Sequence, residues 1–209
     1  EEFLSVGPRD PFKCLYMSSP DRGLEWLLKA WGVITKAMPQ ATLKVLYGFN
    51  SSYDELAKGD ARKVAFKSHI LQGLQQPGIE YLGRVSHARV AHECLTGQLW
   101  TYPCTFQEIS CISAMKAQAG GLIPVVMNTA ALKETVHHGY RINGHIQEPR
   151  LYTAWIDAVV ALLQHPEECE KIRGPMRTWA QETFSWEKVA DDWDRLFSAA
   201  PVKELVHAK

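Results

Sequence analysis

The sequence predicts an α/β fold in which a doubly wound parallel sheet of about six strands is followed by helices at the C-terminal end. Short apolar runs rich in strand-forming residues alternate with segments whose apolar residues recur every three or four positions, the period of a helix. The chain has 209 residues, 46% of them hydrophobic, which suits one sizeable core. No repeat or Gly/Ser-rich linker divides it. Strands that alternate with helices form right-handed βαβ units and hence a parallel sheet.

The first half of the chain contains three strand–helix pairs. The strands are predicted over residues 12–17, 42–47 and 79–82. The first helix carries apolar residues from Leu24 to Ile34 and ends before Pro39. The second is a polar helix with apolar residues from Leu56 to Leu74, and it ends near Pro77. The third begins after Ser86, a favourable N-cap residue, and extends to Leu95.

The second half repeats the alternation more tightly and ends in helices. Strands are predicted over residues 99–102, 123–127 and 140–142. A small-residue helix over 107–119 is expected to be buried, and Thr129 is expected to cap a short helix to Val136. Three more helices are predicted over 150–163, 167–184 and 186–197.

Charge and cysteine content exclude several classes of protein. Lys and Arg number 23, as do Asp and Glu, and this balance argues against a nucleic-acid module and a polybasic membrane surface. No apolar stretch is long enough to cross a bilayer. The five cysteines lack C-x-x-C spacing, which favours reduced, buried thiols in a cytoplasmic protein, and the eight histidines indicate no metal site. Because the chain begins with Glu1, we expect it to belong to a longer one.

A ligand of such a sheet binds beyond the carboxyl ends of its strands, in the loops that lead into the helices. The sequence contains no G-x-G turn, which disfavours a dinucleotide-binding dehydrogenase. Gly78 and Gly83 have the spacing of a phosphate-binding P-loop, but they enclose a predicted strand and precede Arg84 instead of Lys. A P-loop NTPase is therefore disfavoured as well.

The loop over residues 18–23 is one candidate anion site. Arg22 adds a planar cation beside the free N–H groups of a helix start, and Gly23 allows another chain or a ligand to approach closely. An alternative is that Asp21 and Arg22 serve only as helix capping and surface charge. The residues alone support both interpretations about equally.

A second candidate is Glu108, at the predicted start of the small-residue helix. Its carboxylate could accept hydrogen bonds from paired sugar hydroxyls, while the N–H groups of residues 109–112 face a phosphate. An alternative, which the residues alone favour, is a carboxylate that only stabilises the helix dipole. Cys111 lies at the head of the same helix, where we expect its thiol pKa to be lowered.

Four segments resemble retaining glycosyltransferases of family 4. The run YPCTFQEISCISAMKAQAGGLIPVV (102–126) resembles the family signature of a strand ending in Pro, a Glu, seven residues, a second Glu, Ala-x-Ala-x-Gly and Pro-Val-Val. SSPDRGLEWLLKAW (18–31) resembles the first strand–helix turn, YLGRVSHARVA (81–91) the Gly-Arg-Val segment, and ALKETV (131–136) a later loop and helix. Their order and spacing agree with the family over most of residues 12–197.

The resemblance implies the donor-binding C-terminal half of a GT-B glycosyltransferase, a fold of two facing Rossmann-like domains. Residues 1–11 would be a linker, 12–184 the nucleotide-sugar-binding domain, and 185–209 a C-terminal helix and tail. The implied ligand is a UDP-, GDP- or ADP-sugar with no metal or other cofactor, and the implied partner is a missing N-terminal domain. Any contact with a membrane surface would belong to that missing domain.

The resemblance also implies roles for single residues. Glu108 would bind the donor sugar and act in catalysis, and Arg22 would contact the diphosphate beside Ser19 and Gly23. The nucleobase would contact Arg84 and Val85. The sugar and phosphates would touch the backbone of Ser110, Cys111 and Ile112.

Lys116 departs from the family pattern, because the family's second Glu, which accepts both ribose hydroxyls, is a lysine here. An ammonium can only donate hydrogen bonds, so losing the paired contact would cost roughly 1.5–3 kcal/mol unless Lys116 reaches the diphosphate. One alternative is therefore a degenerate, non-catalytic binding or scaffold module. A sugar-nucleotide epimerase is a further alternative that the Glu-centred signature does not support.

Tryptophans in the helical segments are predicted to serve the core and domain packing and not to form a carbohydrate platform; they are Trp26, Trp31, Trp155, Trp179, Trp186 and Trp193. The last helix carries Trp186, Val189, Trp193 and Phe197 at helical spacing. It is expected either to expose this apolar stripe or to fold back on the sheet.

Overall fold

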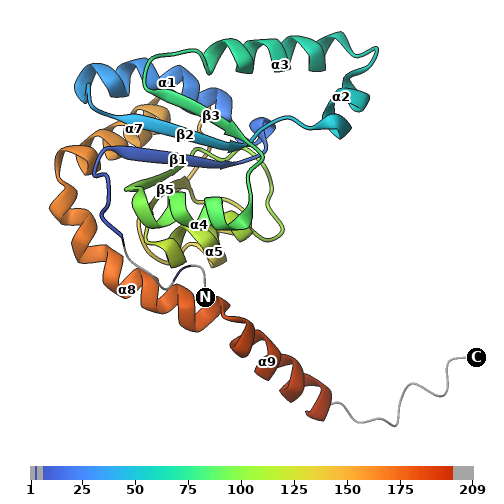
Figure 1. The fold of residues 1–209 in the computed structure, drawn as a ribbon, viewed down its shortest axis with the longest axis vertical. Coiled ribbons are helices and arrows are strands. Elements are labelled where there is room, and N and C mark those ends of the chain that lie inside the picture. Colours follow the sequence, from blue (N-terminus) through green and yellow to red (C-terminus); the bar gives the residue numbers. More distant parts are fainter. Residues whose placement is uncertain (1–2, 4–6, 200–209) are drawn as a thin grey trace, which may run out of the picture.

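The computed structural model describes residue 3 and residues 7–199, and within them a six-stranded, all-parallel sheet lies between two layers of helices (Figure 1). This confirms the predicted fold class. The strands are β1 (Lys13–Ser18), β2 (Thr42–Tyr47), β3 (Ile79–Gly83), β4 (Leu99–Tyr102), β5 (Ile123–Met127) and β6 (Tyr140–Ile142). Their order across the sheet is β3-β2-β1-β4-β5-β6, so the direction of strand progression reverses between β1 and β4.

Helices cover both faces of the sheet (Figure 1). The helices are α1 (Leu24–Ala37), α2 (Ser51–Ala57), α3 (Ala61–Gly73), α4 (His87–Thr96), α5 (Ile112–Gly120), α6 (Leu132–Thr135), α7 (Pro149–Gln164), α8 (Pro166–Phe184) and α9 (Trp186–Ala199). One layer contains α1 packed against α3 and α7, and the other contains α5 packed against α4 and α8. A short 3-10 turn, Pro20–Arg22, precedes α1.

Large aromatic side chains fill the core. Trp31, Trp100 and Trp155 are almost fully buried. The indole N–H of Trp155 donates to the Val125 carbonyl at 3.1 Å, and that of Trp31 donates to the Pro77 carbonyl at 2.9 Å. These two hydrogen bonds offset the free-energy cost of burying the polar indole nitrogens of Trp155 and Trp31. The predicted core role of Trp31 and Trp155 is confirmed, and all five cysteines are buried and unpaired, as expected.

The segment predicted as one helix carrying Leu56 to Leu74 is instead two, α2 and α3. Gly59 has φ +77°, a left-handed backbone conformation that ends the first helix. Asp60 then caps α3, its carboxylate accepting hydrogen bonds from the backbone N–H of Arg62 and Lys63 at 3.0 and 3.2 Å. The apolar pattern runs across this junction, so hydrophobic spacing alone did not reveal the break.

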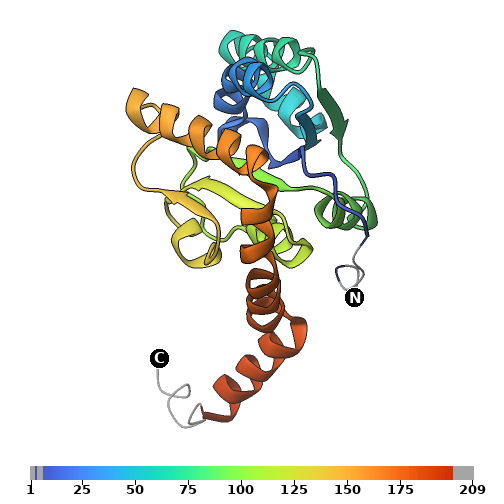
Figure 2. The same cartoon turned by 90° about the vertical axis from the view of Figure 1, so that its left-hand side faces the viewer.

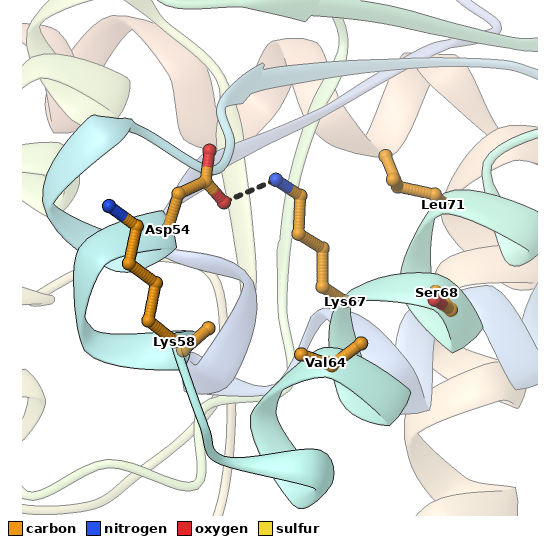
Figure 3. Close-up of a pocket in the computed structure, with 7 residues that line it drawn as sticks. Asp54, Lys58, Val64, Lys67, Ser68 and Leu71 are labelled. Atoms are coloured by element: carbon orange, nitrogen blue, oxygen red, sulfur yellow. Dashed lines mark hydrogen bonds and ion pairs between the residues drawn. The ribbon is translucent and has the colours of Figure 1, made fainter.

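A surface pocket of about 340 Å³ lies between α2 and α3 (Figure 3). Its rim carries an ion pair between Lys67 and Asp54, drawn as the dashed line, and Lys58 pairs with the neighbouring Glu55. Both rim lysines therefore have carboxylate partners, and the pocket presents no excess positive charge.

The other predicted elements agree with the structure to within a few residues, apart from two. Thr129 does not cap α6, which begins three residues later with Ala131 at its N-cap. The buried helix expected from residue 107 begins only at Ile112. Ser86 is the N-cap of α4 as predicted, its hydroxyl accepting from the N–H of Arg89 at 3.2 Å.

Helix α9 leaves the domain and exposes its apolar stripe. None of its residues is buried, and both views show it extending from the end of α8 away from the sheet (Figures 1 and 2). Trp186 is 84% and Trp193 52% exposed, and the ring of Phe197 lies beside that of Trp193, tilted by 30° with 5.3 Å between ring centroids. Of the two expectations for this helix, exposure is therefore the correct one. Within residues 7–199 no helix is long and apolar enough to span a membrane.

A buried ion pair links β1 to α4. Lys13 Nζ donates to Glu93 at 3.0 Å and to the Thr96 hydroxyl at 2.6 Å, and Arg89 donates to the other oxygen of Glu93 at 2.7 Å. Burial alone would raise the pKa of Glu93, but the hydrogen bonds from Lys13 and Arg89 outweigh it and lower the pKa below its ordinary value of 4.5. Glu93 therefore stabilises the fold fully at pH values above 4.5, and its contribution is lost as the pH falls below 4.5 and through the lower pKa of the folded state.

We expect Glu93→Gln to lower the free energy of unfolding by about 3 kcal/mol at pH 7, because it leaves the buried Lys13 without its carboxylate. The difference from the parent should shrink as the pH falls below 4.5. Urea unfolding at several pH values measures both effects. Glu25→Gln is the matched control, because Glu25 pairs with Lys29 on the exposed face of α1 and should cost at most about 0.5 kcal/mol. Equal losses for the two variants would contradict the buried pair's role.

Candidate functional site

The carboxyl ends of β1 and β4 lie side by side at the point where the strand order reverses, and their two loops are in direct contact. The hydroxyl groups of Ser18, the last residue of β1, and Tyr102, the last residue of β4, are 3.1 Å apart. Parallel neighbours bring these loops to one edge of the sheet. The predicted residues Ser19, Arg22, Gly23 and Glu108 all belong to this pair of loops.

Gly23 lets the two loops pack closely. Its φ is +108°, and a Cβ atom placed there would lie 2.1 Å from the carbonyl oxygen of Pro103. Any larger residue would have to displace the backbone of the β4–α5 loop. The close approach predicted at Gly23 is therefore confirmed, and the segment that approaches it is the β4–α5 loop of the same chain.

Arg22 and Glu108 form an ion pair across these loops. Nη1 of Arg22 donates to Oε1 of Glu108 at 3.0 Å and to Oε2 at 2.9 Å. The guanidinium also lies over the ring of Phe106, 4.3 Å from its centroid. Partial burial would lower the pKa of Arg22, but the carboxylate of Glu108 raises it above its ordinary value, so the cation is strongly favoured. The side chain of Arg22 is 33% exposed and that of Glu108 only 5%.

Tyr102 is a second partner of Glu108, and sequence reasoning missed it. Its hydroxyl lies 2.6 Å from Oε1 of Glu108. Burial raises the pKa of Tyr102 far above its ordinary value of 10, so the phenol stays protonated. Its O–H group therefore donates a hydrogen bond to the carboxylate. Ser18 and Phe106 were missed as well. Their place in the sequence could have revealed Ser18 and Tyr102, because these residues end the two central strands of the predicted sheet.

Glu108 does not stand at the start of a helix. Helix α5 begins at Ile112, four residues later, and residues 107–111 belong to the loop. The carboxylate receives side-chain donors from Arg22 and Tyr102, so the interpretation of Glu108 as a helix-dipole carboxylate is wrong. The small, apolar residues that indicated a buried helix, such as Ala114 and Ala117, lie inside α5, and the prediction extended that helix too far toward the N-terminus.

The expected lowering of the Cys111 thiol pKa is also wrong. Cys111 is the N-cap residue of α5, but burial raises the pKa of its thiol to about 12. The carboxylate of Glu108 adds to this shift, and Arg22 opposes it only weakly. Cys111 is therefore a neutral thiol at physiological pH and not a nucleophile.

The rest of the loop forms an exposed rim. Ser110 and Ile112 are exposed, and Ile109 is 95% exposed beside the buried Glu108. Behind this rim, the Ser113 hydroxyl donates to the Met17 carbonyl of β1 at 2.6 Å and fixes the first turn of α5 to the sheet. The predicted residues Ser110, Cys111 and Ile112 thus lie in the same loop as Glu108 and at the start of α5.

Arg84 and Val85 lie at the ends of a different strand pair, β2 and β3. Nη2 of Arg84 donates to the Tyr47 hydroxyl at 3.2 Å, and its guanidinium lies 4.9 Å from the centre of the Tyr47 ring. Tyr47 has φ +87°, an unusual backbone conformation for a tyrosine. In residues 7–199 no hydrogen bond or ion pair joins these residues to Arg22 or Glu108.

Lys116 lies in the second turn of α5, partly buried, beside Cys94 of α4. Burial raises the pKa of the Cys94 thiol to about 12, and the nearby charge of Lys116 only opposes this shift. Among the described residues Lys116 has no carboxylate partner. A cation that has no counter-ion in the described part of the chain therefore occupies the position where the family resemblance implies a carboxylate.

Comparison with known proteins identifies the family. The family model described as glycosyl transferases group 1 matches residues 12–165, which include the whole sheet and the loops just described. The chain belongs to this family. No curated protein sequence matches it.

Solved structures of glycosyltransferases share the fold. The chain resembles the pneumococcal O-GlcNAc transferase GtfA in complex with UDP and GlcNAc, with a TM-score of 0.67 and 18% identity over 91% of this chain and 36% of that one. It resembles HepE of Anabaena in complex with UDP and glucose, with a TM-score of 0.70 and 14% identity over 90% and 48%. It also resembles sucrose-phosphate synthase of Thermosynechococcus elongatus, with a TM-score of 0.69 and 19% identity over 93% and 47%. The chain thus spans less than half of each, and it has the Rossmann-like fold of a GT-B domain.

We expect a double-mutant cycle with Arg22→Ala and Glu108→Gln to give a coupling energy of about 1–3 kcal/mol in unfolding experiments, because the pair is largely desolvated on the Glu108 side. The exposed pair of Lys171 and Glu168 on α8 serves as the control, with an expected coupling of at most about 0.5 kcal/mol. A coupling near zero for Arg22 and Glu108 would show that the ion pair does not hold the two loops together.

Proposed function

We propose that this group 1 glycosyltransferase chain binds a nucleoside diphosphate sugar and supplies the donor site of a retaining transferase. The observation that carries the proposal is the pairing of Arg22 with Glu108 where the strand order reverses. A cation and a buried carboxylate within one hydrogen bond of each other suit a ligand whose anionic and hydroxyl-bearing parts are joined. A hexosyl diphosphate has these two parts.

The proposed chemistry needs no metal ion. Arg22 would neutralise the departing diphosphate, assisted by the N–H groups at the start of α5, and Glu108 would accept hydrogen bonds from the donor sugar. Ser19 and Gly23 would border the diphosphate, and Ser110, Cys111 and Ile112 would border the sugar. The nucleobase would extend toward Arg84 and Val85 at the ends of β2 and β3.

Transfer would require a second domain. The chain spans between 36% and 48% of the three similar structures. Helix α9 extends away from the sheet (Figure 2), and its apolar stripe is exposed. We propose that an N-terminal domain covers this stripe and contributes the acceptor site. The chain alone would then bind a donor without transferring its sugar to an acceptor.

Isothermal titration of the 209-residue chain with UDP-, GDP- and ADP-sugars tests the proposal. We expect one base to bind, and we expect Arg22→Gln to weaken that binding at least about tenfold, because it removes the charge-assisted contact with phosphate. Lys36→Gln, which removes an exposed cation at the far end of α1, should leave the affinity unchanged. Failure of the parent to bind any of the three ligand classes would overturn the proposed function.

Lys116→Glu tests what the departure from the family pattern does. If the site takes an ordinary ribose, the restored carboxylate can accept two hydroxyl hydrogen bonds, and affinity should rise about ten- to a hundredfold. Lys36→Glu is the control for the change in net charge. A parent that binds no donor, together with a Lys116→Glu variant that binds one, would support the degenerate binding module instead. Weaker binding by the variant would show that Lys116 contacts the diphosphate.

A further inference from the structure

We propose that Tyr102 is the positioning residue that holds Glu108 in place when a donor diphosphate draws Arg22 away from it. The inference rests on the proposed function, because it concerns the same ligand. It assigns different tasks to the two oxygens of Glu108. Oε1 is held by Tyr102, whereas Oε2 has Arg22 as its only hydrogen-bond partner among the described residues and becomes the acceptor for a sugar hydroxyl.

Arg22 can exchange its contact with Glu108 for a contact with a phosphate. Both of its bonds to Glu108 come from the single nitrogen Nη1, so the two-nitrogen fork with which arginine grips a carboxylate or phosphate is not used. Within the described part of the chain, Nη2 and Nε have no hydrogen-bond partner. The side chain is one-third exposed and lies over the exposed ring of Phe106, where it can turn without unfolding either loop.

The contact made by Tyr102 cannot be exchanged in the same way. Its ring is fully buried and stacks on Trp100, with 4.8 Å between ring centroids and 22° between the planes. Tyr16 packs against it at 5.7 Å. Because Tyr102 donates its only proton to Glu108, the Ser18 hydroxyl at 3.1 Å must be the donor to the phenol oxygen. The chain of donors therefore runs from Ser18 through Tyr102 to Glu108.

Burial of Glu108 explains why a second partner is needed. A carboxylate that is 5% exposed is costly once its cation leaves, unless another donor remains on it. The hydroxyl of Tyr102 supplies that donor and keeps the carboxyl plane fixed, with Oε2 directed to the place that Arg22 vacates. The donor sugar then meets an acceptor that is already oriented.

The variant Tyr102→Phe tests the inference through the binding affinities of two ligands that share a base. One is the nucleoside diphosphate and the other is the nucleoside diphosphate glucose, and the comparison is made for UDP, GDP and ADP. The diphosphate meets Arg22, whereas only the glucosyl ligand meets Glu108. We expect affinity for the glucosyl ligand to fall about tenfold while affinity for the diphosphate changes less than about twofold. In saturation-transfer NMR of the glucosyl ligand, the signals of the sugar protons should weaken relative to those of the base protons.

Two further variants keep the test decisive. Thr101→Val removes a neighbouring buried hydroxyl that donates to the Leu15 carbonyl at 3.1 Å. It should lower the stability of the fold without changing the ratio of the two ligand affinities. Ser18→Ala should lower the affinity for the glucosyl ligand about threefold more than the affinity for the diphosphate, the same direction as Tyr102→Phe. This variant can be measured if Tyr102→Phe does not fold. Equal weakening of both ligands, or no change in either, would overturn the role of Tyr102 while leaving the proposed function intact. A parent that binds neither ligand of any base would overturn both.

Discussion

The ion pair between Arg22 and Glu108 is the contact that joins the two halves of the sheet at their functional edge. Arg22 follows β1 and Glu108 follows β4, the two strands between which the strand order reverses. A carboxylate this deeply buried requires a donor, and a one-third-exposed guanidinium supplies one that can also turn to a ligand. The same contact therefore stabilises the packing of the two loops and, in the proposed function, provides the groups that bind a sugar diphosphate.

The surrounding fold holds these loops in register. Gly23 allows the backbone of the β1 loop to lie against Pro103, Ser113 fixes the start of α5 to the end of β1, and the stacked rings of Trp100 and Tyr102 form a rigid floor. On the opposite edge, the buried pair of Lys13 and Glu93 joins β1 to α4. Rigid strands thus position a loop whose outer residues, such as Ile109, remain exposed.

Sequence reasoning predicted the strands to within one residue, because buried parallel strands are short apolar runs that turn residues delimit. It also placed Arg22, Gly23 and Glu108 at one edge, since parallel topology requires this. It failed where local patterns compete with tertiary contacts. The apolar spacing concealed the break at Gly59, and the small residues of α5 led the prediction to start that helix at residue 107 and not at Ile112. Tyr102 was missed because a hydrogen bond between a strand end and a loop six residues away has no periodic signal.

A crystal structure of the chain with its nucleoside diphosphate bound tests most directly whether Arg22 is shared between Glu108 and the ligand. The account predicts that Arg22 nitrogens lie within hydrogen-bond distance of a phosphate oxygen and no longer contact Oε2 of Glu108. It also predicts that the Tyr102 hydroxyl stays on Oε1 at its present distance of 2.6 Å. A diphosphate bound elsewhere while Arg22 keeps both contacts with Glu108 would contradict the account.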